Sequence, residues 1–337
     1  MKRRSLLKVF PLTFLPSSLL QGCNPLEQQG KRAADRYIEI GELPFKKTNA
    51  FSLLSGSQIP NDTVNLVVMG DSGVANDEQK QVSDMIANYH QQYPVDAIIH
   101  TGDIIYPDGL SSPDDTLGYS HFEDYYLRPE LMKADSQPVP IYAVLGNHDH
   151  YGDADAMIEF SKQHSQVLQL PSRYYKVNTK HAGISGVETE IFFLDSYPMT
   201  KNRTRYEQIA WLDQQLNAST AERKIIVTHH PLRVYGYYHD NAYLKDTIEV
   251  LAEQYGVCVC LAGHDHQLQI QTGSNGITYL VSGAGGAALR SSGVGSDSIF
   301  SAAQHGAIAI QISSSHIRYI PLIEFNSEYP DYEYYRQ

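Results

Sequence analysis

The feature that most constrains the fold of this chain is a short apolar run that ends in a glycine or a polar turn and recurs along most of the sequence. Each run is too short for a buried helix and ends in turn residues, so it predicts a buried strand followed by a loop. The runs are NLVVMGDSG, DAIIHTGD, PIYAVLGNHDH, EIFFLDS, KIIVTHHP, VCVCLAGHDH and ITYLVSGAGG.

Amphipathic segments lie between these runs and predict helices. They cover about residues 76–89, with Asn76 as the N-terminal cap, about 205–216 and about 240–255, where Gly256 ends the helix. Strands that alternate with helices predict α/β layers with largely parallel pairing. In such sheets, functional side chains gather in the loops at the carboxyl ends of the strands.

Composition and charge limit the classes of function. The chain has 337 residues, of which 42% are hydrophobic, and this is enough for a sizeable core. Acidic residues outnumber basic ones by 38 to 26, which gives a formal net charge of −12. This charge argues against nucleic acid or an anionic lipid surface as a partner, and any chemistry on phosphate would need local positive charge.

The N-terminal segment resembles an export signal rather than part of the fold. MKRRSLLK carries Arg3 and Arg4, and the apolar stretch VFPLTFLPSSLL is too short and too rich in proline to span a bilayer. The segment ends in LQGC, so it is similar to a twin-arginine signal closed by a lipoprotein cleavage box. We expect acylation of Cys23 to anchor an exported protein at the periplasmic or cell-envelope face, with no other membrane contact. The alternative is an ordinary secretory signal in which Cys23 is incidental.

Five strand-end loops carry side chains that can bind metal ions. Taken singly, each is a weak signal, because an aspartate after a strand often caps a helix and a lone histidine is seldom a ligand. Their fixed order is what indicates a common site. In chain order they are Asp71 in GDSG, Asp103 and Tyr106 in GDIIY, Asn147 and His148 in GNHDH, His229 in THHP, and His264 and His266 in GHDH.

These ordered motifs resemble those of the metallophosphoesterase superfamily, from about residue 64 to 290. The blocks of that superfamily are an Asp motif, GD, GNH followed by Asp or Glu, a single His, and GHxH. The resemblance implies a four-layer α/β/β/α sandwich in which two facing mixed sheets are flanked by helices. It also implies two metal ions at the strand ends and hydrolysis of phosphoesters.

One departure from the superfamily pattern narrows the resemblance. Most members carry D-x-H in the first block, whereas this chain has Asp71-Ser72-Gly73 and lacks that histidine. Purple acid phosphatases also lack it and place a tyrosine three residues after the bridging aspartate, where this chain has Tyr106. AWLDQQL, GHDHQLQ and SGAGG are similar to segments of the small, mammalian tartrate-resistant type. Departures from that type, at positions that are not ligands, are Ser72, Ile104, Ile105 and His230.

The resemblance implies two different metal ions. Charge counting agrees, because the first ligand set holds three anions if the phenol ionises and suits a trivalent ion, while the second adds only neutral groups to the shared carboxylate. The implied Fe(III) ligands are Asp71, Asp103, Tyr106 and His266. The implied ligands of Fe(II), Zn(II) or Mn(II) are Asp103, Asn147, His229 and His264.

The activity that the resemblance implies is an acid phosphatase that cleaves phosphate monoesters with a metal-bound hydroxide as nucleophile. The substrate would be a phosphorylated small molecule or a phosphoprotein. His148 matches the family histidine that protonates the leaving group, and Asp149 either orients that imidazole or only builds the loop. His230 and His239 are candidates for the substrate pocket, and the alternative for His239, in a loop rich in tyrosine, is a surface role.

Other classes of function stay open at this point. A phosphodiesterase or nucleotidase could use the same centre, because the GNHD motif does not distinguish them. A lipoprotein that only binds is a second alternative, against which the complete ligand set argues. A calcineurin-like protein phosphatase is disfavoured because D-x-H is missing.

The chain divides into four predicted segments. The segments are an export signal at 1–23, a tether and lead-in at 24–60, a metallophosphoesterase domain at 61–325 and a tyrosine-rich tail at 326–337. The sequence indicates no oligomeric state.

Overall fold

The structure is a computed structural model that describes residues 62–201, 204–323 and 334–336, all within the compact unit Leu43–Gln337. The predicted export signal, the tether and most of the C-terminal tail lie outside the described residues. Acylation of Cys23 and the cellular location therefore stay predictions. Within the described part of the chain, no helix is both long and apolar enough to cross a membrane.

The described strands form two sheets. The first contains, in spatial order, β14 Tyr334–Arg336, β13 Ile317–Ile323, β12 Gly306–Ile312, β1 Val64–Met69, β2 Ala97–His100, β3 Ile141–Ala143 and β4 Leu168–Gln169. The second contains β11 Ser298–Ala302, β9 Leu268–Thr272, β10 Thr278–Ser282, β8 Val259–Ala262, β7 Arg223–Val227, β6 Thr189–Phe193 and β5 Tyr175–Asn178. In each sheet a parallel group is extended by antiparallel strands, so both sheets are mixed.

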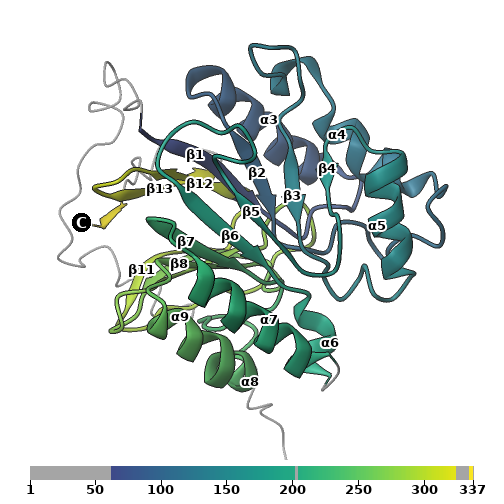
Figure 1. Ribbon diagram of the computed structural model, residues 1–337. Coiled ribbons are helices and arrows are strands. Elements are labelled where there is room, and N and C mark those ends of the chain that lie inside the picture. Colours follow the sequence, from purple (N-terminus) through teal and green to yellow (C-terminus); the bar gives the residue numbers. More distant parts are fainter. Residues whose placement is uncertain (1–61, 202–203, 324–333, 337) are drawn as a thin grey trace, which may run out of the picture. The chain divides into compact units, whose positions relative to one another are not determined.

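Helices cover the outer faces of both sheets (Figure 1). Beside the first sheet lie α3 Asp77–Gln92, η2 Tyr119–Glu123, α4 Asp124–Tyr126, η3 Pro129–Leu131 and α5 Ala154–Gln163. Beside the second lie α6 Ser196–Thr200, α7 Arg205–Ala218, α8 Ala242–Leu244, η4 Lys245–Glu249 and α9 Val250–Gln254. The predicted four-layer α/β/β/α sandwich is confirmed.

The side-chain pattern of β7 shows why the layers form. Ile225 and Val227 belong to the apolar cluster that the two sheets share, while Ile226 packs in a second cluster with Leu212 of α7 and Ile248 of η4. Successive side chains of a strand point to opposite faces. A continuous apolar run such as KIIV is therefore buried on both sides, by a sheet on one and by helices on the other.

The seven predicted strands are present, but the expectation of largely parallel pairing is wrong in part. β9 and β11 to β14 pair antiparallel, and β5 pairs antiparallel with β6. No helix separates β9 from β10, β11 from β12, or β12 from β13, and the turns between them are short. The pattern of strand, loop and helix that reveals parallel strands in the sequence is therefore absent there.

The predicted helices differ in how regular they are. Asn76 caps α3 as expected, because its side-chain oxygen accepts a hydrogen bond from the Gln79 N–H at 2.9 Å. The helix expected at 240–255 consists instead of α8, η4 and α9, and its cap is Asn241. The wider turn in η4 keeps Leu244 and Ile248 buried against the second sheet.

A tyrosine ties the two sheets together. The phenol oxygen of Tyr175, on β5, donates to the Ala143 carbonyl at 2.8 Å and accepts from the Ala143 N–H at 3.1 Å, and Ala143 is the last residue of β3. The Tyr175 ring stacks on Phe193 with centroids 4.5 Å apart. The hydroxyl thus satisfies backbone groups at the end of a short strand in the other sheet.

We expect Tyr175→Phe to lower the free energy of unfolding by about 1–3 kcal/mol, because buried groups of Ala143 lose their partner. Urea unfolding followed by circular dichroism measures the change. The control is Tyr174→Phe, since the Tyr174 hydroxyl has no hydrogen bond among the described residues and its ring packs on Trp211. Equal losses in the two variants would contradict the role of the Tyr175 hydroxyl.

Candidate metal centre

Loops at the carboxyl ends of strands from both sheets meet at one edge of the sandwich. Asp71 follows β1, Asp103 follows β2 and His229 follows β7. One ligand atom of each lies within 4.8 Å of the others, and all three side chains are buried. Because β1 and β2 belong to the first sheet and β7 to the second, this cluster lies on the seam between the sheets.

Backbone strain marks three of the predicted ligand positions. Asp71, Asp103 and His264 have φ angles of 57°, 53° and 66°, in the left-handed region that residues with a Cβ rarely adopt. Such residues cost about 1–3 kcal/mol each and cluster at functional sites. Gly146 leaves the space that one of them needs, since a Cβ at this glycine would lie 2.1 Å from Asp103 Oδ1.

Tyr106 reaches the same point as the carboxylates. Its phenol oxygen lies 3.0 Å from Asp103 Oδ2, 3.3 Å from Asp71 Oδ1 and 3.3 Å from His266 Nε2. Burial and the negative charges of Asp71 and Asp103 raise the pKa of the phenol well above its ordinary value. Protein groups alone therefore keep this hydroxyl protonated, and only a bound cation would favour the phenolate.

In the second predicted ligand set, the Nε2 atom of His229 lies close to atoms of the other three predicted ligands. His229 Nδ1 donates to the Thr101 carbonyl at 2.9 Å, so Nε2 of the neutral ring has no proton. That Nε2 lies 3.1 Å from Asn147 Oδ1, 3.2 Å from His264 Nδ1 and 3.4 Å from Asp103 Oδ2. Burial opposes a charged imidazole, but the charge and hydrogen bond of Asp103 outweigh it and raise the pKa of His229 to about 9. A proton thus fills a place that a metal ion could take.

His266 has the same arrangement on the other side of the cluster. Its Nδ1 donates to the Ala288 carbonyl at 2.8 Å, and its Nε2 lies 3.4 Å from Asp71 Oδ1. A backbone carbonyl that fixes one imidazole nitrogen and aims the other at the centre is the usual support of a metal-binding histidine. The His264 N–H donates to Asp71 Oδ2 at 2.9 Å and so joins the GHDH loop to the first strand.

His148 lies beside Tyr106, with ring centroids 4.2 Å apart. Its backbone N–H donates to Asp103 Oδ1 at 2.8 Å, and its Nδ1 hydrogen bonds to the Pro107 carbonyl. The carbonyl can only accept, so Nδ1 carries a proton and Nε2 is the nitrogen left for a substrate. The ring is partly exposed at the edge of the cluster.

The structure shows which groups the Asp149 carboxylate contacts. Its buried carboxylate accepts backbone N–H groups of Ile104 at 2.9 Å, Ile105 at 3.1 Å and Gly146 at 2.8 Å. It therefore joins the GDIIY loop to the GNHDH loop. The Pro107 carbonyl holds the His148 imidazole, and a role of Asp149 in orienting that ring stays a prediction.

The two pocket candidates differ in position. The His230 ring lies 4.3 Å from that of His264, and its Nδ1 is 3.0 Å from Ser196 Oγ. His239 is exposed and has no hydrogen bond or ring contact with the described residues of the cluster. Its neighbour Tyr238 instead stacks on His264, with centroids 4.3 Å apart and planes 14° apart. The assignment of His239 to the pocket stays a prediction.

Comparison with known proteins agrees with this geometry. The family model described as calcineurin-like phosphoesterase matches residues 64–268, which is more than half of the chain. The chain belongs to the calcineurin-like phosphoesterase family. It is 30% identical over 254 residues to tartrate-resistant acid phosphatase type 5 of Rattus norvegicus, an alignment that covers 69% of this chain and 76% of the relative.

Solved structures with a similar fold are known. Purple acid phosphatase PPD1 from yellow lupin (Lupinus luteus) seeds matches 83% of this chain and 55% of its own, with a TM-score of 0.60 and 16% identity. GAP50, described as the anchor in the inner membrane complex of Plasmodium, matches 79% of this chain and 87% of its own, with a TM-score of 0.67 and 19% identity. At these identities the likeness concerns the fold alone.

Metallophosphoesterases and their purple acid phosphatase members use a dinuclear metal centre. The donor set of this chain fits such a centre, because carboxylate, phenol and amide oxygens and imidazole nitrogens converge, and two of the imidazoles are held by carbonyls. Among its carboxylate and imidazole groups, Asp71, Asp103 and His229 form a compact cluster.

Sequence reasoning missed His100, the last residue of β2, which supports this phosphoesterase site from beneath. The Gly102 N–H donates to His100 Nδ1 at 3.2 Å, so the ring proton lies on Nε2, which is 2.9 Å from Ser72 Oγ. Ser72 adjoins Asp71 and Gly102 adjoins Asp103, so this one neutral imidazole links the two aspartate loops. The departure from the tartrate-resistant type at Ser72 thus has a structural partner within β2.

A pH effect follows from the burial of His100. Burial, with a further contribution from the charge of His229, lowers the pKa of the His100 imidazole to about 3, against about 6.5 in an unfolded chain. The unfolded state therefore binds one more proton between these pH values, so the free energy of unfolding falls as the pH drops from about 6.5 towards 3.

We expect His100→Gln to reduce this slope by up to about 1.4 kcal/mol per pH unit, because glutamine does not titrate. Urea unfolding of metal-free protein at several pH values between about 3.5 and 6.5, the range in which His100 affects stability, measures the slope. His181→Gln, which removes an exposed histidine between β5 and β6, is the matched control. A slope that changes equally in both variants, or in neither, would refute the assignment.

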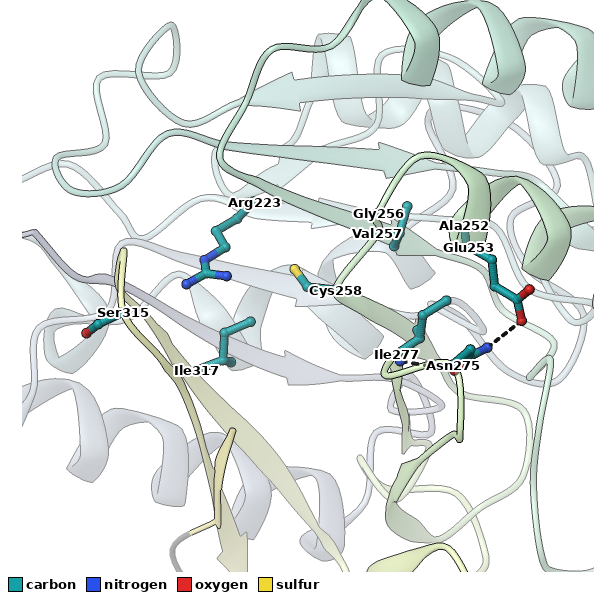
Figure 2. Close-up of a pocket in the computed structure, with 10 residues that line it drawn as sticks. All are labelled: Arg223, Ala252, Glu253, Gly256, Val257, Cys258, Asn275, Ile277, Ser315 and Ile317. Atoms are coloured by element: carbon teal, nitrogen blue, oxygen red, sulfur yellow. Dashed lines mark hydrogen bonds between the residues drawn. The ribbon is translucent and has the colours of Figure 1, made fainter. Parts of the chain in front are cut away.

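A separate pocket of about 260 Å³ lies at the opposite edge of the sandwich (Figure 2). Arg223 at the start of β7 and Cys258 just before β8 line it, together with Ile317 at the start of β13. At one end, Asn275 Nδ2 donates to Glu253 Oε1 at 2.8 Å. None of the predicted site residues lines this pocket, so it does not take part in the metal centre.

Proposed function

We propose that this protein is a purple acid phosphatase-like hydrolase that cleaves phosphate monoesters. The observation that carries the proposal is the position of Tyr106. Its phenol oxygen lies 3.0–3.3 Å from Asp103, Asp71 and His266, in a chain that lacks the histidine usual after Asp71. A third anionic ligand of this kind suits a trivalent ion and distinguishes this chain from most metallophosphoesterases.

In this proposal two ions occupy the centre. When bound, they would polarise the phosphoryl oxygens and lower the pKa of a bound water. Asp103 suits the shared position, because Oδ1 is fixed by the His148 N–H while Oδ2 faces both Tyr106 and His229. The proposed Fe(III) ligands are Asp71, Asp103, Tyr106 and His266. The proposed ligands of Fe(II), Zn(II) or Mn(II) are Asp103, Asn147, His229 and His264.

His148 is the proposed general acid. Its Nδ1 is held by the Pro107 carbonyl, so Nε2 is available to hold a proton near the leaving-group oxygen. The backbone bond to Asp103 keeps the residue next to the centre, and its partial exposure leaves the ring accessible to a substrate. The substrate would be a phosphorylated small molecule or a phosphoprotein.

We expect iron-loaded, oxidised wild-type protein to be purple, and Tyr106→Phe to lose the visible band, because a phenolate bound to Fe(III) gives a charge-transfer absorption. Visible spectroscopy with iron analysis measures colour per bound iron. The control is Tyr151→Phe, whose hydroxyl accepts from Asn147 Nδ2 at 3.1 Å but lies outside the proposed ligand set. A colourless iron-loaded wild type would defeat the assignment of Tyr106.

Substrate preference gives the second test. We expect kcat/KM for 4-nitrophenyl phosphate to exceed that for bis(4-nitrophenyl) phosphate by about tenfold or more, since a monoester presents more negative charge to a centre that holds a trivalent ion. Steady-state assays on metal-loaded protein measure the ratio. A preference for the diester would favour the phosphodiesterase alternative, and no turnover on any phosphoester would favour a binding role.

A further inference from the structure

We propose that Arg290 forms an anion subsite beside the metal centre, which binds a second anionic group, a carboxylate or a phosphate, on the leaving group of the substrate. The inference rests on the proposed phosphatase function and deepens it, because it names the class of monoester that the site prefers. Four observations on Arg290 carry it: its attachment, its aromatic contacts, its unpaired charge and its remaining donors.

Arg290 is attached to the segment that carries a predicted ligand. Its backbone N–H donates to the His266 carbonyl at 3.0 Å. Two residues earlier, the Ala288 carbonyl accepts from His266 Nδ1 at 2.8 Å. The loop after β10 is therefore bonded to both the backbone and the ring of His266, and this fixes where the arginine side chain starts.

Two tyrosines then hold the guanidinium. Its central carbon lies 4.9 Å from the centroid of the Tyr237 ring and 4.7 Å from that of Tyr238. Arg290 Nη1 also donates to the Tyr238 hydroxyl at 2.8 Å. Since the Tyr238 ring stacks on His264 with centroids 4.3 Å apart, a single aromatic ring connects the guanidinium to a predicted ligand. Contacts of this kind orient a cation without neutralising it.

The charge of Arg290 has no carboxylate partner among the described residues. Arg128 pairs with Asp84 at 2.6 Å, and Arg233 pairs with Glu249 at 2.5 Å, whereas no acidic oxygen of residues 62–201 or 204–323 forms an ion pair with the Arg290 guanidinium. The chain has a net charge of −12, and the Arg290 guanidinium places a positive charge beside the proposed phosphate site. It supplies the local positive charge that phosphate chemistry on an acidic protein needs.

The guanidinium keeps donors for a ligand. It has five N–H groups, and the Tyr238 hydroxyl is its only side-chain acceptor in the described part of the chain. The side chain is partly exposed, and the adjoining Tyr237 is 61% exposed, so a ligand can reach it from solvent. A planar fork with free N–H groups matches the two oxygens of a carboxylate or phosphate.

A structural role for Arg290 is the competing explanation. The side chain could serve only to hold the loop with Tyr237 and Tyr238 against the ligand loop. Its removal would then disturb His264 and reduce the hydrolysis of every substrate alike. A subsite instead acts only on substrates that carry the second anion, so the test compares two matched substrates.

The experiment measures phenyl phosphate and 4-carboxyphenyl phosphate hydrolysis by metal-loaded wild type, Arg290→Met and Arg290→Lys. For each substrate, kcat/KM of the variant is divided by kcat/KM of the wild type, and this ratio cancels the difference between the leaving groups. For Arg290→Met we expect kcat/KM to fall by about 10- to 100-fold on the carboxylated substrate, mainly through KM, and by less than about threefold on phenyl phosphate. Arg290→Lys should fall in between, because it keeps the charge and loses the fork.

Lys180→Ala is the matched control for the change in net charge, since Lys180 is an exposed cation between β5 and β6, at the opposite edge of the sandwich. It should leave both ratios near one. Equal losses on the two substrates in Arg290→Met, or no loss on either, would overturn the subsite. A phosphoserine peptide with a neighbouring aspartate, assayed alongside, shows whether a peptide or a small molecule presents the second anion better.

A binding measurement separates this inference from the proposed function. Calorimetry of metal-loaded protein with phenylphosphonate and with 4-carboxyphenylphosphonate requires no turnover. We expect wild type to bind the carboxylated analogue about tenfold or more tightly than the plain one, and Arg290→Met to lose that preference. If the protein binds the carboxylated analogue more tightly but hydrolyses no monoester, the proposed phosphatase function is refuted and the subsite is supported. If it hydrolyses both monoesters but binds both analogues equally, the subsite is refuted and the phosphatase function is supported.

Discussion

The hydrogen bond from His229 Nδ1 to the Thr101 carbonyl is the interaction on which the centre depends most. Thr101 follows β2 of the first sheet and His229 follows β7 of the second, so the bond crosses the seam between the sheets. By taking one ring nitrogen, it aims the other at Asn147, His264 and Asp103. This one contact thus both joins the two sheets and directs a candidate ligand towards the centre.

The remaining candidate ligands divide between the sheets by chemistry. Oxygen donors come from the loops after β1, β2 and β3, and imidazole nitrogens come from the loops after β7 and β8. Neither sheet holds a complete set for either proposed ion. Two buried groups keep the oxygen side in shape: His100 links the loops of Asp71 and Asp103, and Asp149 links GDIIY to GNHDH. Both groups form hydrogen bonds with backbone atoms or with residues next to the ligands. The ligand atoms themselves therefore stay free to point into the centre.

Much of this arrangement could be predicted from the sequence because its signals are local and ordered. The apolar runs fixed the strands around the site, and the pairing of a missing histidine with Tyr106 indicated which side chain joins the aspartates. The sequence does not show the pattern of strand, loop and helix around the antiparallel strands, so their pairing was not predicted. His100 and Arg290 were also missed, because a buried histidine in AIIH and an arginine after SGAGG acquire meaning only from partners far along the chain, Ser72 and Tyr238. For Asp149 the sequence left two roles open, and it could not show that the carboxylate accepts backbone N–H groups from two different loops.

The contact of Tyr175 with Ala143 has a consequence beyond its own hydrogen bonds. Since the proposed ions would be held by both sheets at once, a metal-loaded centre acts as a removable crosslink, and ligands that bind only the folded state add to its stability by mass action. The phenol of Tyr175 is a permanent crosslink between the same two layers. In the metal-free chain this hydroxyl acts together with the shared apolar core and the His229–Thr101 hydrogen bond to hold the two sheets in place around the candidate ligands.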